Sequence, residues 1–231
     1  MKKILIIGAT SELAEDFIAK YKGEFELYLA SRNSSKLGKQ TKLINIDFDQ
    51  FDESCFDDLP ELDGIIYYAG ITSHTPVKLT KKRHYDAVFN ANFYGAFAST
   101  TALLKNNKLA NNASLVFLSS IAAHYPYFGG ALYVSSKMAL EGFVKTLAIE
   151  LAPKKIKVNA VAPTFVKGEM SDSISNFTSQ KNMETFSKKH PFGNISRDDV
   201  TELIHFLLSD KNNSITGQIL QVGNFNTGLN S

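Results

Sequence analysis

The feature that most constrains the fold is a regular alternation between short apolar runs and longer amphipathic stretches. The apolar runs do not alternate with polar residues, which indicates strands buried on both faces, as in a parallel sheet. We predict strands at 4–7, 27–30, 43–46, 64–68, 115–118, 157–161 and 219–222, and helices at 12–20, 85–104, 133–151 and 200–208. Strand–helix alternation of this kind predicts a three-layer α/β/α fold around a doubly wound parallel sheet.

The composition indicates one globular unit. The chain has 231 residues, of which 44% are hydrophobic, and we predict a single domain over residues 1–231. Within it, residues 167–189 are polar and rich in Ser and Asn, with a few large apolar residues, and we interpret them as an amphipathic substrate flap. The formal net charge of +2 gives no electrostatic footprint for nucleic acid or an anionic membrane, so neither is expected as a partner.

Cysteine and histidine usage narrows the chemistry further. Cys55 is the only cysteine, which rules out an intrachain disulfide and fits a reducing cytoplasm, the expected location. The five histidines show no paired ligand spacing, so no metal site is expected. The apolar run that follows Lys2 and Lys3 is too short for a secretory signal, and no run is long enough to span a bilayer.

The first strand leads into a tight turn of small residues and then a helix. Backbone N–H groups at a helix N-terminus, together with the helix dipole, bind phosphate, so this turn is a candidate pyrophosphate site. Gly8 permits the turn, and Thr10 and Ser11 can add hydroxyl donors. The alternative is an ordinary strand-to-helix turn, because an isolated glycine motif is weak.

The end of the second strand bears on the choice of dinucleotide. An NAD site uses an acidic residue here to hold the ribose 2′-hydroxyl, whereas this chain has Ser31 and Arg32. Arg32 can grip a 2′-phosphate through charge-assisted hydrogen bonds, so we expect NADP(H) to be preferred over NAD(H). Arg32 could equally be an ordinary surface arginine. Asp47, after the third strand, could accept a hydrogen bond from the adenine amino group or cap a turn.

Tyr133 and Lys137 are the candidate catalytic pair, since residues four apart share one helical face. A free tyrosine has a pKa of ~10, and a nearby ammonium favours the phenolate that proton exchange at neutral pH requires. Ser120 follows the fifth strand, where its hydroxyl could stabilise charge developing on a substrate oxygen. The alternative for the pair is a half-buried tyrosine beside a surface lysine.

Asn92 lies in the middle of the predicted helix 85–104. One interpretation is that it holds a water that relays protons from Lys137. The other is a polar residue whose hydrogen bonds are satisfied inside a helix interface.

In their order and spacing, these residues resemble the short-chain dehydrogenase/reductase family, from about residue 3 to about residue 222. The resemblance extends to Tyr68-Ala69-Gly70 and to the segments 158–163 and 215–218. It implies a Rossmann-like fold and catalytic roles for Asn92, Ser120, Tyr133 and Lys137. It implies cofactor contacts from Gly8, Thr10, Ser11, Leu13, Ser31, Arg32, Asp47, Ala69, Gly70, Tyr133, Lys137, Pro163 and Val166.

The chain also departs from the family pattern. Glu12 and Ala14 stand where the family has its second and third glycines, and Tyr68 replaces an asparagine that steadies the central sheet. Thr164 replaces a glycine, and Gly168 stands where the family has a threonine that helps to hold the nicotinamide carboxamide.

The resemblance implies hydride transfer between NADPH and a carbonyl or alcohol, with a 3-oxoacyl thioester or a small ketone as candidate substrates. Specificity is expected to come from the flap 167–189 and from residues 124–128, whose aromatics suggest a partly apolar pocket or core packing. The long helices 85–104 and 133–151 resemble the family's subunit interface, which implies a homo-oligomer, a tetramer or a dimer. The rival readings are a cofactor-binding regulator with little turnover and an interaction protein that has lost the cofactor.

Overall fold

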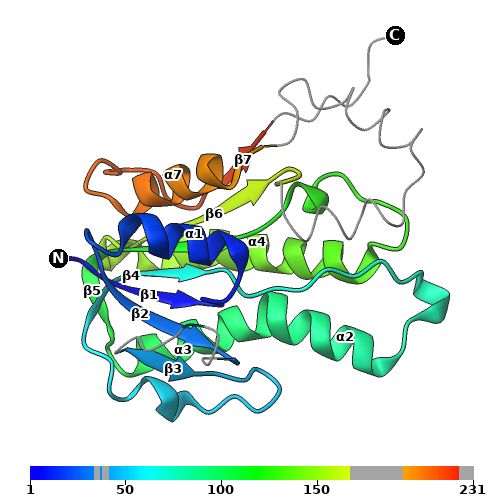
Figure 1. Ribbon diagram of the computed structural model, residues 1–231, viewed down its shortest axis with the longest axis horizontal. Coiled ribbons are helices and arrows are strands. Elements are labelled where there is room, and N and C mark those ends of the chain that lie inside the picture. The colour runs from blue at the N-terminus through cyan, green and yellow to red at the C-terminus, as the bar shows by residue number, and fades with distance from the viewer. Residues whose placement is uncertain (34–36, 38–41, 167–194, 224–231) are drawn as a thin grey trace, which may run out of the picture.

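The computed structural model describes residues 1–33, 37, 42–166 and 195–223. The predicted flap 167–189, with Gly168, lies outside the described residues. The described chain forms a seven-stranded sheet in the order β3-β2-β1-β4-β5-β6-β7 (Figure 1). All neighbouring strands are parallel, which confirms the doubly wound sheet. The strands are β1 (Lys3–Ile7), β2 (Glu26–Ser31), β3 (Leu43–Asn45), β4 (Leu62–Tyr67), β5 (Leu109–Leu118), β6 (Lys157–Pro163) and β7 (Ile219–Val222).

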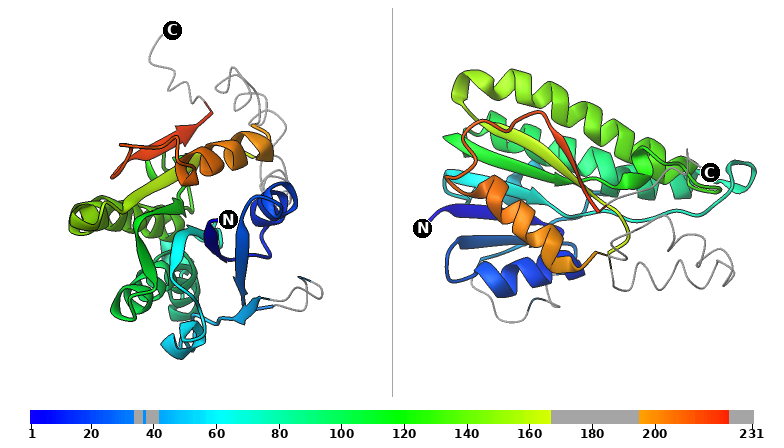
Figure 2. Two further views of the ribbon diagram at one scale, coloured as in Figure 1. Left: turned by 90° about the vertical axis from the view of Figure 1, so that its left-hand side faces the viewer. Right: turned by 90° about the horizontal axis from the view of Figure 1, so that it is seen from above.

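Helices cover both faces of the sheet, as Figure 2 shows from two further directions, so the three-layer prediction is confirmed. The helices are α1 (Glu12–Tyr21), α2 (Lys82–Phe89), α3 (Gly95–Lys105), α4 (Ala131–Leu151) and α7 (Arg197–Leu208). In addition, short 3₁₀ helices lie in the loops, among them η3 (Val77–Leu79) and η5 (Ile121–Ala123). Among the described residues, no helix has the length and apolar character needed to cross a membrane.

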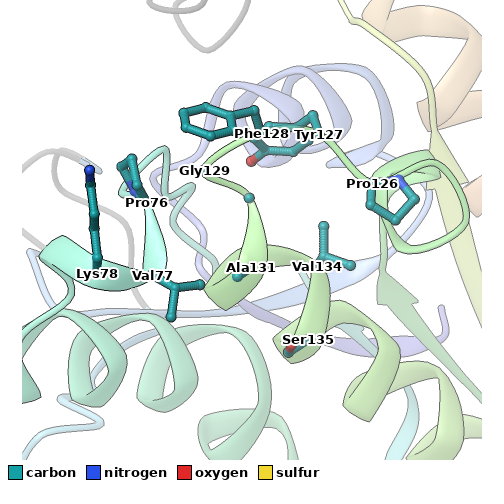
Figure 3. A pocket seen from close by; sticks show the side chains of 11 residues that line it. Pro76, Val77, Lys78, Pro126, Tyr127, Phe128, Gly129, Ala131, Val134 and Ser135 are labelled. Atoms are coloured by element: carbon teal, nitrogen blue, oxygen red, sulfur yellow. The ribbon is translucent and has the colours of Figure 1, made fainter.

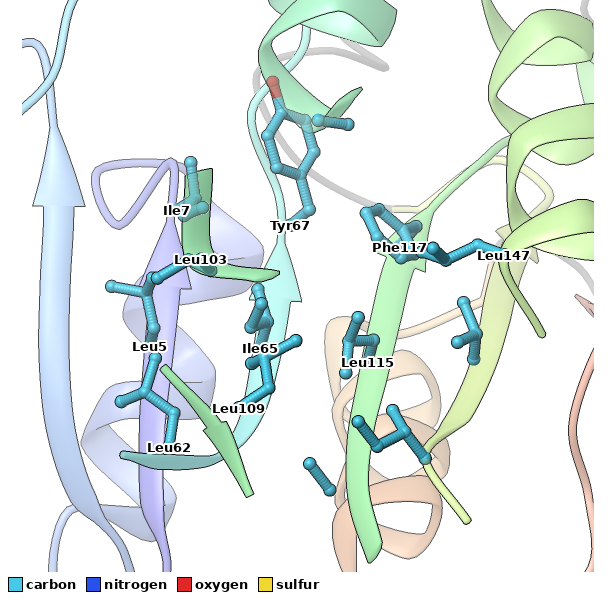
Figure 4. Packing of buried hydrophobic residues seen from close by; sticks show 14 of the residues in the cluster. Leu5, Ile7, Leu62, Ile65, Tyr67, Leu103, Leu109, Leu115, Phe117 and Leu147 are labelled. Atoms are coloured by element: carbon cyan, nitrogen blue, oxygen red, sulfur yellow. The ribbon is translucent and has the colours of Figure 1, made fainter. Parts of the chain in front are cut away.

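Each face of the sheet has its own apolar core. On one face Leu5, Ile65 and Phe117 pack with residues of α3 and α4 (Figure 4). On the other face Ile4, Ile6 and their neighbours pack with α1 and α7. Successive side chains of one strand point to opposite faces, so a strand with helices on both sides must be apolar at every position.

Two predicted elements differ from the structure. β5 begins at Leu109 rather than at residue 115. The apolar pattern missed the first part of this strand because exposed asparagines, including Asn112 with φ 66°, interrupt it. The helix predicted over 85–104 is not continuous. It consists of α2, a π-helical segment at Asn90–Tyr94 (called the π turn below) and α3. A π turn inserts one extra residue into a helix, and an apolar pattern with a period of 3.6 does not reveal it.

Candidate active site

The candidate site lies where the carboxyl ends of the central strands meet. The strand order reverses between β1 and β4, and in open α/β sheets ligands bind at such a switch point. Gly8 follows β1, Gly70 comes soon after β4, and Ser120 soon after β5, while Pro163 ends β6. The topology therefore brings four of the predicted site segments to one edge of the sheet.

Gly8 forms the tightest part of this edge. Its φ is +84°, and a Cβ on this residue would lie 2.4 Å from the backbone nitrogen of Ala69. The backbone N–H groups of Gly8 and Ala9 both donate to the carbonyl of Ala30, at 2.9 and 3.1 Å. The ends of β1, β2 and β4 thus meet at a position that only glycine fits.

The turn that follows begins helix α1. Ser11 is the N-cap, and its hydroxyl accepts a hydrogen bond from the backbone N–H of Ala14 at 3.3 Å. The Thr10 and Ser31 hydroxyls are hydrogen-bonded at 3.0 Å, which links the turn to the end of β2. Arg32 follows directly and is exposed. The structure therefore brings the predicted phosphate and ribose contacts together.

The Glu12 carboxylate faces helix α7. One of its oxygens lies 3.5 Å from Nη1 of Arg197, whose Nε contacts Asp16 at 2.8 Å. Arg197 thus partly compensates a negative charge that would otherwise repel a pyrophosphate at the N-terminus of α1.

Asp47 caps a turn, as one of its two interpretations predicted. Its side chain accepts a hydrogen bond from the backbone N–H of Asp49 at 3.1 Å, just beyond β3. The remaining predicted cofactor contacts follow β4, lie at or just after the end of β6, or lie in the first turn of α1, namely Ala69, Gly70, Pro163, Val166 and Leu13.

Tyr133 and Ser120 meet at the start of helix α4. The Tyr133 side chain is buried, with 9% of the residue exposed, and it lies beside the Ser120 hydroxyl. Ser120 also accepts a hydrogen bond from the backbone N–H of Ala122 at 3.2 Å, which fixes its side chain at the end of β5. Burial raises the pKa of Tyr133, and the neighbouring Ser120 hydroxyl opposes this effect.

Lys137 lies one turn further along the helix and is buried. Its Nζ donates to the carbonyl of Leu118 at 2.7 Å and lies 5.8 Å from the centre of the Tyr133 ring. Burial lowers the pKa of Lys137 to about 8, and the charge of Glu141 opposes this effect. The net shift of the Tyr133 pKa is upward in this structure, and the expectation that the charge of Lys137 favours the phenolate stays a prediction. Because both groups are buried, desolvation dominates each pKa and favours the neutral forms.

Asn92 is completely buried in the π turn. Its Oδ1 accepts from the backbone N–H of Ile71 at 2.7 Å, and its Nδ2 donates to the Ile71 carbonyl at 3.0 Å and to the Ser136 hydroxyl at 2.9 Å. The amide is therefore satisfied, as one of its two interpretations predicted. A Cβ on Gly70 would lie 3.0 Å from Asn92 Oδ1 and 3.4 Å from Lys137 Nζ, so these three residues also adjoin.

Sequence reasoning missed a buried carboxylate next to this group. Glu141 is 5% exposed, and it accepts a hydrogen bond from the Ser119 hydroxyl at 2.7 Å. Its other oxygen lies 3.2 Å from Nε2 of His124. The available signal was its position, four residues after Lys137 on the same helical face. Within the described parts of the chain, no three His, Cys, Asp or Glu side chains are grouped so that they could hold a metal ion.

A cavity of about 620 Å³ adjoins the site (Figure 3). Residues 126–131 and η3 border it with mostly apolar side chains, and Phe128 at its margin is 90% exposed. Tyr127 lines the cavity and also packs against the apolar cluster that contains Tyr133. Its hydroxyl donates to the Ser73 carbonyl at 3.0 Å. Of the predicted segment 124–128, residues 126–128 line the cavity, and Tyr127 alone is also found in core packing. Neither Ser120 nor Tyr133 lines the cavity, so it lies beside these two candidate residues.

Comparison with known sequences identifies the family. Residues 46–224 match the family described as enoyl-(acyl carrier protein) reductase. The chain is 33% identical over 162 residues to a 3-oxoacyl-(acyl-carrier-protein) reductase of Thermotoga maritima, a match that covers 70% of this chain and 64% of that protein. It is 34% identical over 164 residues to the reductase of the same name from Rickettsia felis, covering 71% and 66% of the two chains.

Solved structures show the same fold. ElxO with NADP bound is 26% identical, with a TM-score of 0.79 and coverage of 96% of this chain and 97% of that one. A 3-ketoacyl-(acyl-carrier-protein) reductase from Brucella melitensis complexed with NADH is 24% identical, with a TM-score of 0.78 and 96% of each chain covered. A 4-hydroxyisoleucine dehydrogenase complexed with NADH has a TM-score of 0.84 at 23% identity, covering 98% and 99%. The chain belongs to the short-chain dehydrogenase/reductase family of oxidoreductases.

Proposed function

We propose that the protein is an NADP(H)-dependent oxidoreductase that transfers hydride between NADPH and a carbonyl or alcohol substrate. The observation that carries this proposal is the grouping of Ser120 and Tyr133 at the carboxyl edge of the sheet, with Lys137 one helical turn away. Asn92 adjoins the same group through Gly70. These four residues are the proposed catalytic set.

In the reduction direction, Tyr133 donates its phenolic proton to the substrate carbonyl oxygen. Burial raises the pKa of Tyr133, so the phenol stays protonated at neutral pH and is available as an acid. The Ser120 hydroxyl donates a hydrogen bond to the same oxygen as negative charge develops there. NADPH, when bound, supplies the hydride.

Lys137 supplies positive charge beside the reacting oxygen. Because its pKa is about 8, the ammonium form predominates at pH 7. That charge favours the departure of the proton from Tyr133, and the same ammonium can hold the nicotinamide ribose hydroxyls. Asn92, held by Ile71 and Ser136, adjoins Lys137.

The residues at the start of the chain fit a dinucleotide phosphate. The N-terminus of α1 presents backbone N–H groups, and the Glu12 carboxylate is paired with Arg197. Ser31 and Arg32 provide no carboxylate at the end of β2, and the exposed guanidinium can bind a 2′-phosphate. The proposed preference for NADP(H) over NAD(H) rests on this arrangement. Leu13, Asp47, Ala69, Gly70, Pro163 and Val166 complete the proposed cofactor contacts.

The proposed substrate is a 3-oxoacyl thioester or a small ketone. The first is favoured because the Thermotoga and Rickettsia relatives are 3-oxoacyl-(acyl-carrier-protein) reductases. Residues 167–189 and 124–128 would select between the two. The alternative, a cofactor-binding regulator with little turnover, is motivated by Tyr68 and Gly168. Glu12 no longer favours it, because Arg197 partly compensates its charge.

We also propose a homo-oligomer, a dimer or tetramer, formed through α3 and α4. Phe97 of α3 is 48% exposed, and together with Phe93 and Phe143 it borders a groove between the two helices. An exposed apolar surface of this kind is typical of subunit interfaces. Sedimentation at micromolar concentration tests this proposal, and a monomer there would contradict it.

The deciding experiment titrates the protein separately with NADPH and NADH, followed by reduced-nicotinamide fluorescence. We expect NADPH to bind more tightly, and Arg32→Ala to weaken NADPH more than NADH. Arg83→Ala, which removes another exposed arginine, serves as the control. A carbonyl screen with Tyr133→Phe as the inactive control follows. Binding of neither nucleotide would support the interaction-protein alternative, and binding without turnover on any carbonyl would support the regulator.

A further inference from the structure

Tyr67, the last residue of β4, makes a contact with the π turn that the proposed catalytic set does not include. Its side chain is 1% exposed, and its hydroxyl donates to the carbonyl of Ala91 at 2.7 Å. Figure 4 shows the ring with its oxygen at the end of the apolar cluster, beyond Ile65 and Ile7. This is a single buried hydrogen bond between the end of a central strand and an irregular helical turn.

The geometry of the π turn explains why Ala91 needs this donor. In an α-helix the N–H of Gly95 would bond to the carbonyl of Ala91, four residues earlier. Here it bonds instead to Asn90, five residues earlier. In the π turn the Ala91 carbonyl thus lacks its α-helical donor, the N–H of Gly95. The Tyr67 hydroxyl donates a hydrogen bond to this carbonyl instead. A buried carbonyl left without a partner is costly, so the two features depend on each other.

The Tyr67 hydroxyl occupies space that Gly95 leaves open. A Cβ on Gly95 would lie 2.5 Å from the Tyr67 hydroxyl and 2.7 Å from the ring of Phe48. The chain therefore has room for the phenolic oxygen only because residue 95 is glycine. The Tyr67 hydroxyl therefore packs against Gly95, the residue at which the π turn ends and α3 begins.

Asn92 is the residue that follows Ala91. Its side-chain amide accepts a hydrogen bond from the backbone N–H of Ile71 and donates one to the Ile71 carbonyl. Tyr67 and Ile71 belong to the same segment at the end of β4, so this segment holds the π turn at two points. From Asn92 the chain of hydrogen bonds continues to Ser136, whose hydroxyl donates to the Tyr133 carbonyl at 2.7 Å.

We propose that Tyr67 is a positioning residue, whose hydroxyl holds the π turn in the form that places Asn92 against Ile71, Ser136 and the surroundings of Lys137. It touches no reacting atom and acts through Asn92. This inference rests on the proposed function only for its effect on turnover. Its effect on the π turn itself does not depend on any substrate.

The neighbouring residue supplies a matched control. Tyr68 is also buried, at 3% exposure, but its hydroxyl has no hydrogen-bond partner among the described residues. It lies in the core on the opposite face of the sheet, with α1 and α7. Tyr67→Phe and Tyr68→Phe therefore remove the same atom from adjacent residues, and only the first removes a hydrogen bond.

The experiment has one readout that is independent of activity. Amide hydrogen exchange is measured by mass spectrometry on the two variants and the unmodified protein. We expect Tyr67→Phe to accelerate exchange in peptides that cover 90–96 and 71, by about tenfold or more because a buried carbonyl loses its donor. Peptides from β1 should exchange as before, and Tyr68→Phe should match the unmodified protein throughout.

The second readout is NADPH oxidation with acetoacetyl-CoA as the probe carbonyl. We expect Tyr67→Phe to lower kcat by about tenfold with the KM for NADPH within about twofold, and to alter the pH profile of kcat. Because Tyr67 acts through Asn92, adding Tyr67→Phe to Asn92→Ala should lower kcat little further.

The outcomes separate the two proposals. If Tyr67→Phe exchanges and turns over like Tyr68→Phe, the positioning role is wrong. Faster exchange around the π turn with an unchanged kcat would make Tyr67 a purely structural residue and would also overturn it. If the unmodified protein reduces no carbonyl while the exchange prediction holds, the proposed function fails and the role of Tyr67 in holding the π turn stands.

Discussion

The Ser119 hydroxyl donates a 2.7 Å hydrogen bond to the buried carboxylate of Glu141, which also lies 3.2 Å from Nε2 of His124. Ser119 stands between Leu118, whose carbonyl accepts from Lys137, and Ser120, which lies beside Tyr133. The carboxylate therefore acts on the candidate site in two ways. It fixes the end of β5 through a hydrogen bond, and its charge raises the pKa of Lys137 against the effect of burial.

We predict that Glu141→Gln shifts the activity profile to lower pH. Removing the negative charge takes away an influence that raises the pKa of Lys137, so this pKa falls below its value of about 8. The ammonium is then lost at lower pH, and NADPH oxidation should decline earlier as pH rises. The measurement is kcat against pH. Glu61→Gln, at an exposed position, is the control, and a profile that coincides with that control would show that Glu141 does not act on Lys137.

We also predict that the buried charge of Lys137 lowers the free energy of unfolding. Below about pH 8 the lysine is protonated in the folded and unfolded states alike, and the full cost of burying its charge is present. Between about 8 and 10.5 the folded protein has lost this proton and the unfolded chain has kept it, so the free energy of unfolding rises with pH across this window.

It follows that Lys137→Met should abolish turnover and stabilise the fold at pH 7, by up to about 3 kcal/mol from a pKa lowered from 10.5 to about 8. The advantage should shrink toward pH 10.5. Urea unfolding at several pH values measures both effects. A variant that is less stable than the unmodified protein at pH 7 would mean that the hydrogen bond to Leu118 outweighs the cost of desolvation.

Arg197 should support cofactor binding from a distance. It pairs with Glu12 and Asp16 on α1, so Arg197→Ala removes a positive charge beside Glu12, close to the proposed phosphate site. We expect NADPH to bind about threefold more weakly at low salt, since partly exposed charges of this kind are worth a fraction of a kcal/mol to about 1 kcal/mol. Adding Glu12→Gln should restore most of the affinity in a fluorescence titration. No recovery in the double variant would exclude the charge of Glu12 as the cause.

Gly8→Ala should destabilise the fold strongly. The new Cβ would meet the Ala69 nitrogen at 2.4 Å, in a backbone conformation with φ +84°. We expect a loss of about 2–4 kcal/mol, because strain and overlap with backbone atoms add together. At Gly23 an added Cβ would meet no atom within 4 Å, so Gly23→Ala should change stability little. Thermal unfolding compares the two, and equal melting temperatures would contradict the prediction.

The sheet, its layers and most helices were predictable from the sequence because burial on both faces makes every parallel strand a continuous apolar run. β1, β4 and β7 are identifiable from their apolar residues alone, to within two residues at each end. The family resemblance singled out Tyr133, Ser120 and Asn92 as site residues, and their catalytic roles stay a prediction. The start of β5 was not, because Asn112 and its neighbours are polar and exposed although they belong to the strand.

Contacts between distant segments were beyond the sequence pattern. The partner of Glu12 comes from α7, and the partners of Glu141 lie soon after β5. The upward shift of the Tyr133 pKa was not predictable, because spacing reports which groups are near each other but not how deeply they are buried.

The π turn has a consequence for how this fold can change. Each residue of an α-helix turns the chain by about 100°, so deleting one residue from Asn90–Tyr94 would restore α-helical phase and rotate the two flanking helices relative to each other by about that angle. Either Asn92 or the apolar stripe of α3 would then face the wrong way. A change of one residue in length at this turn would therefore disturb either the position of Asn92 or the packing of α3. Natural variation in length at this point should be rare.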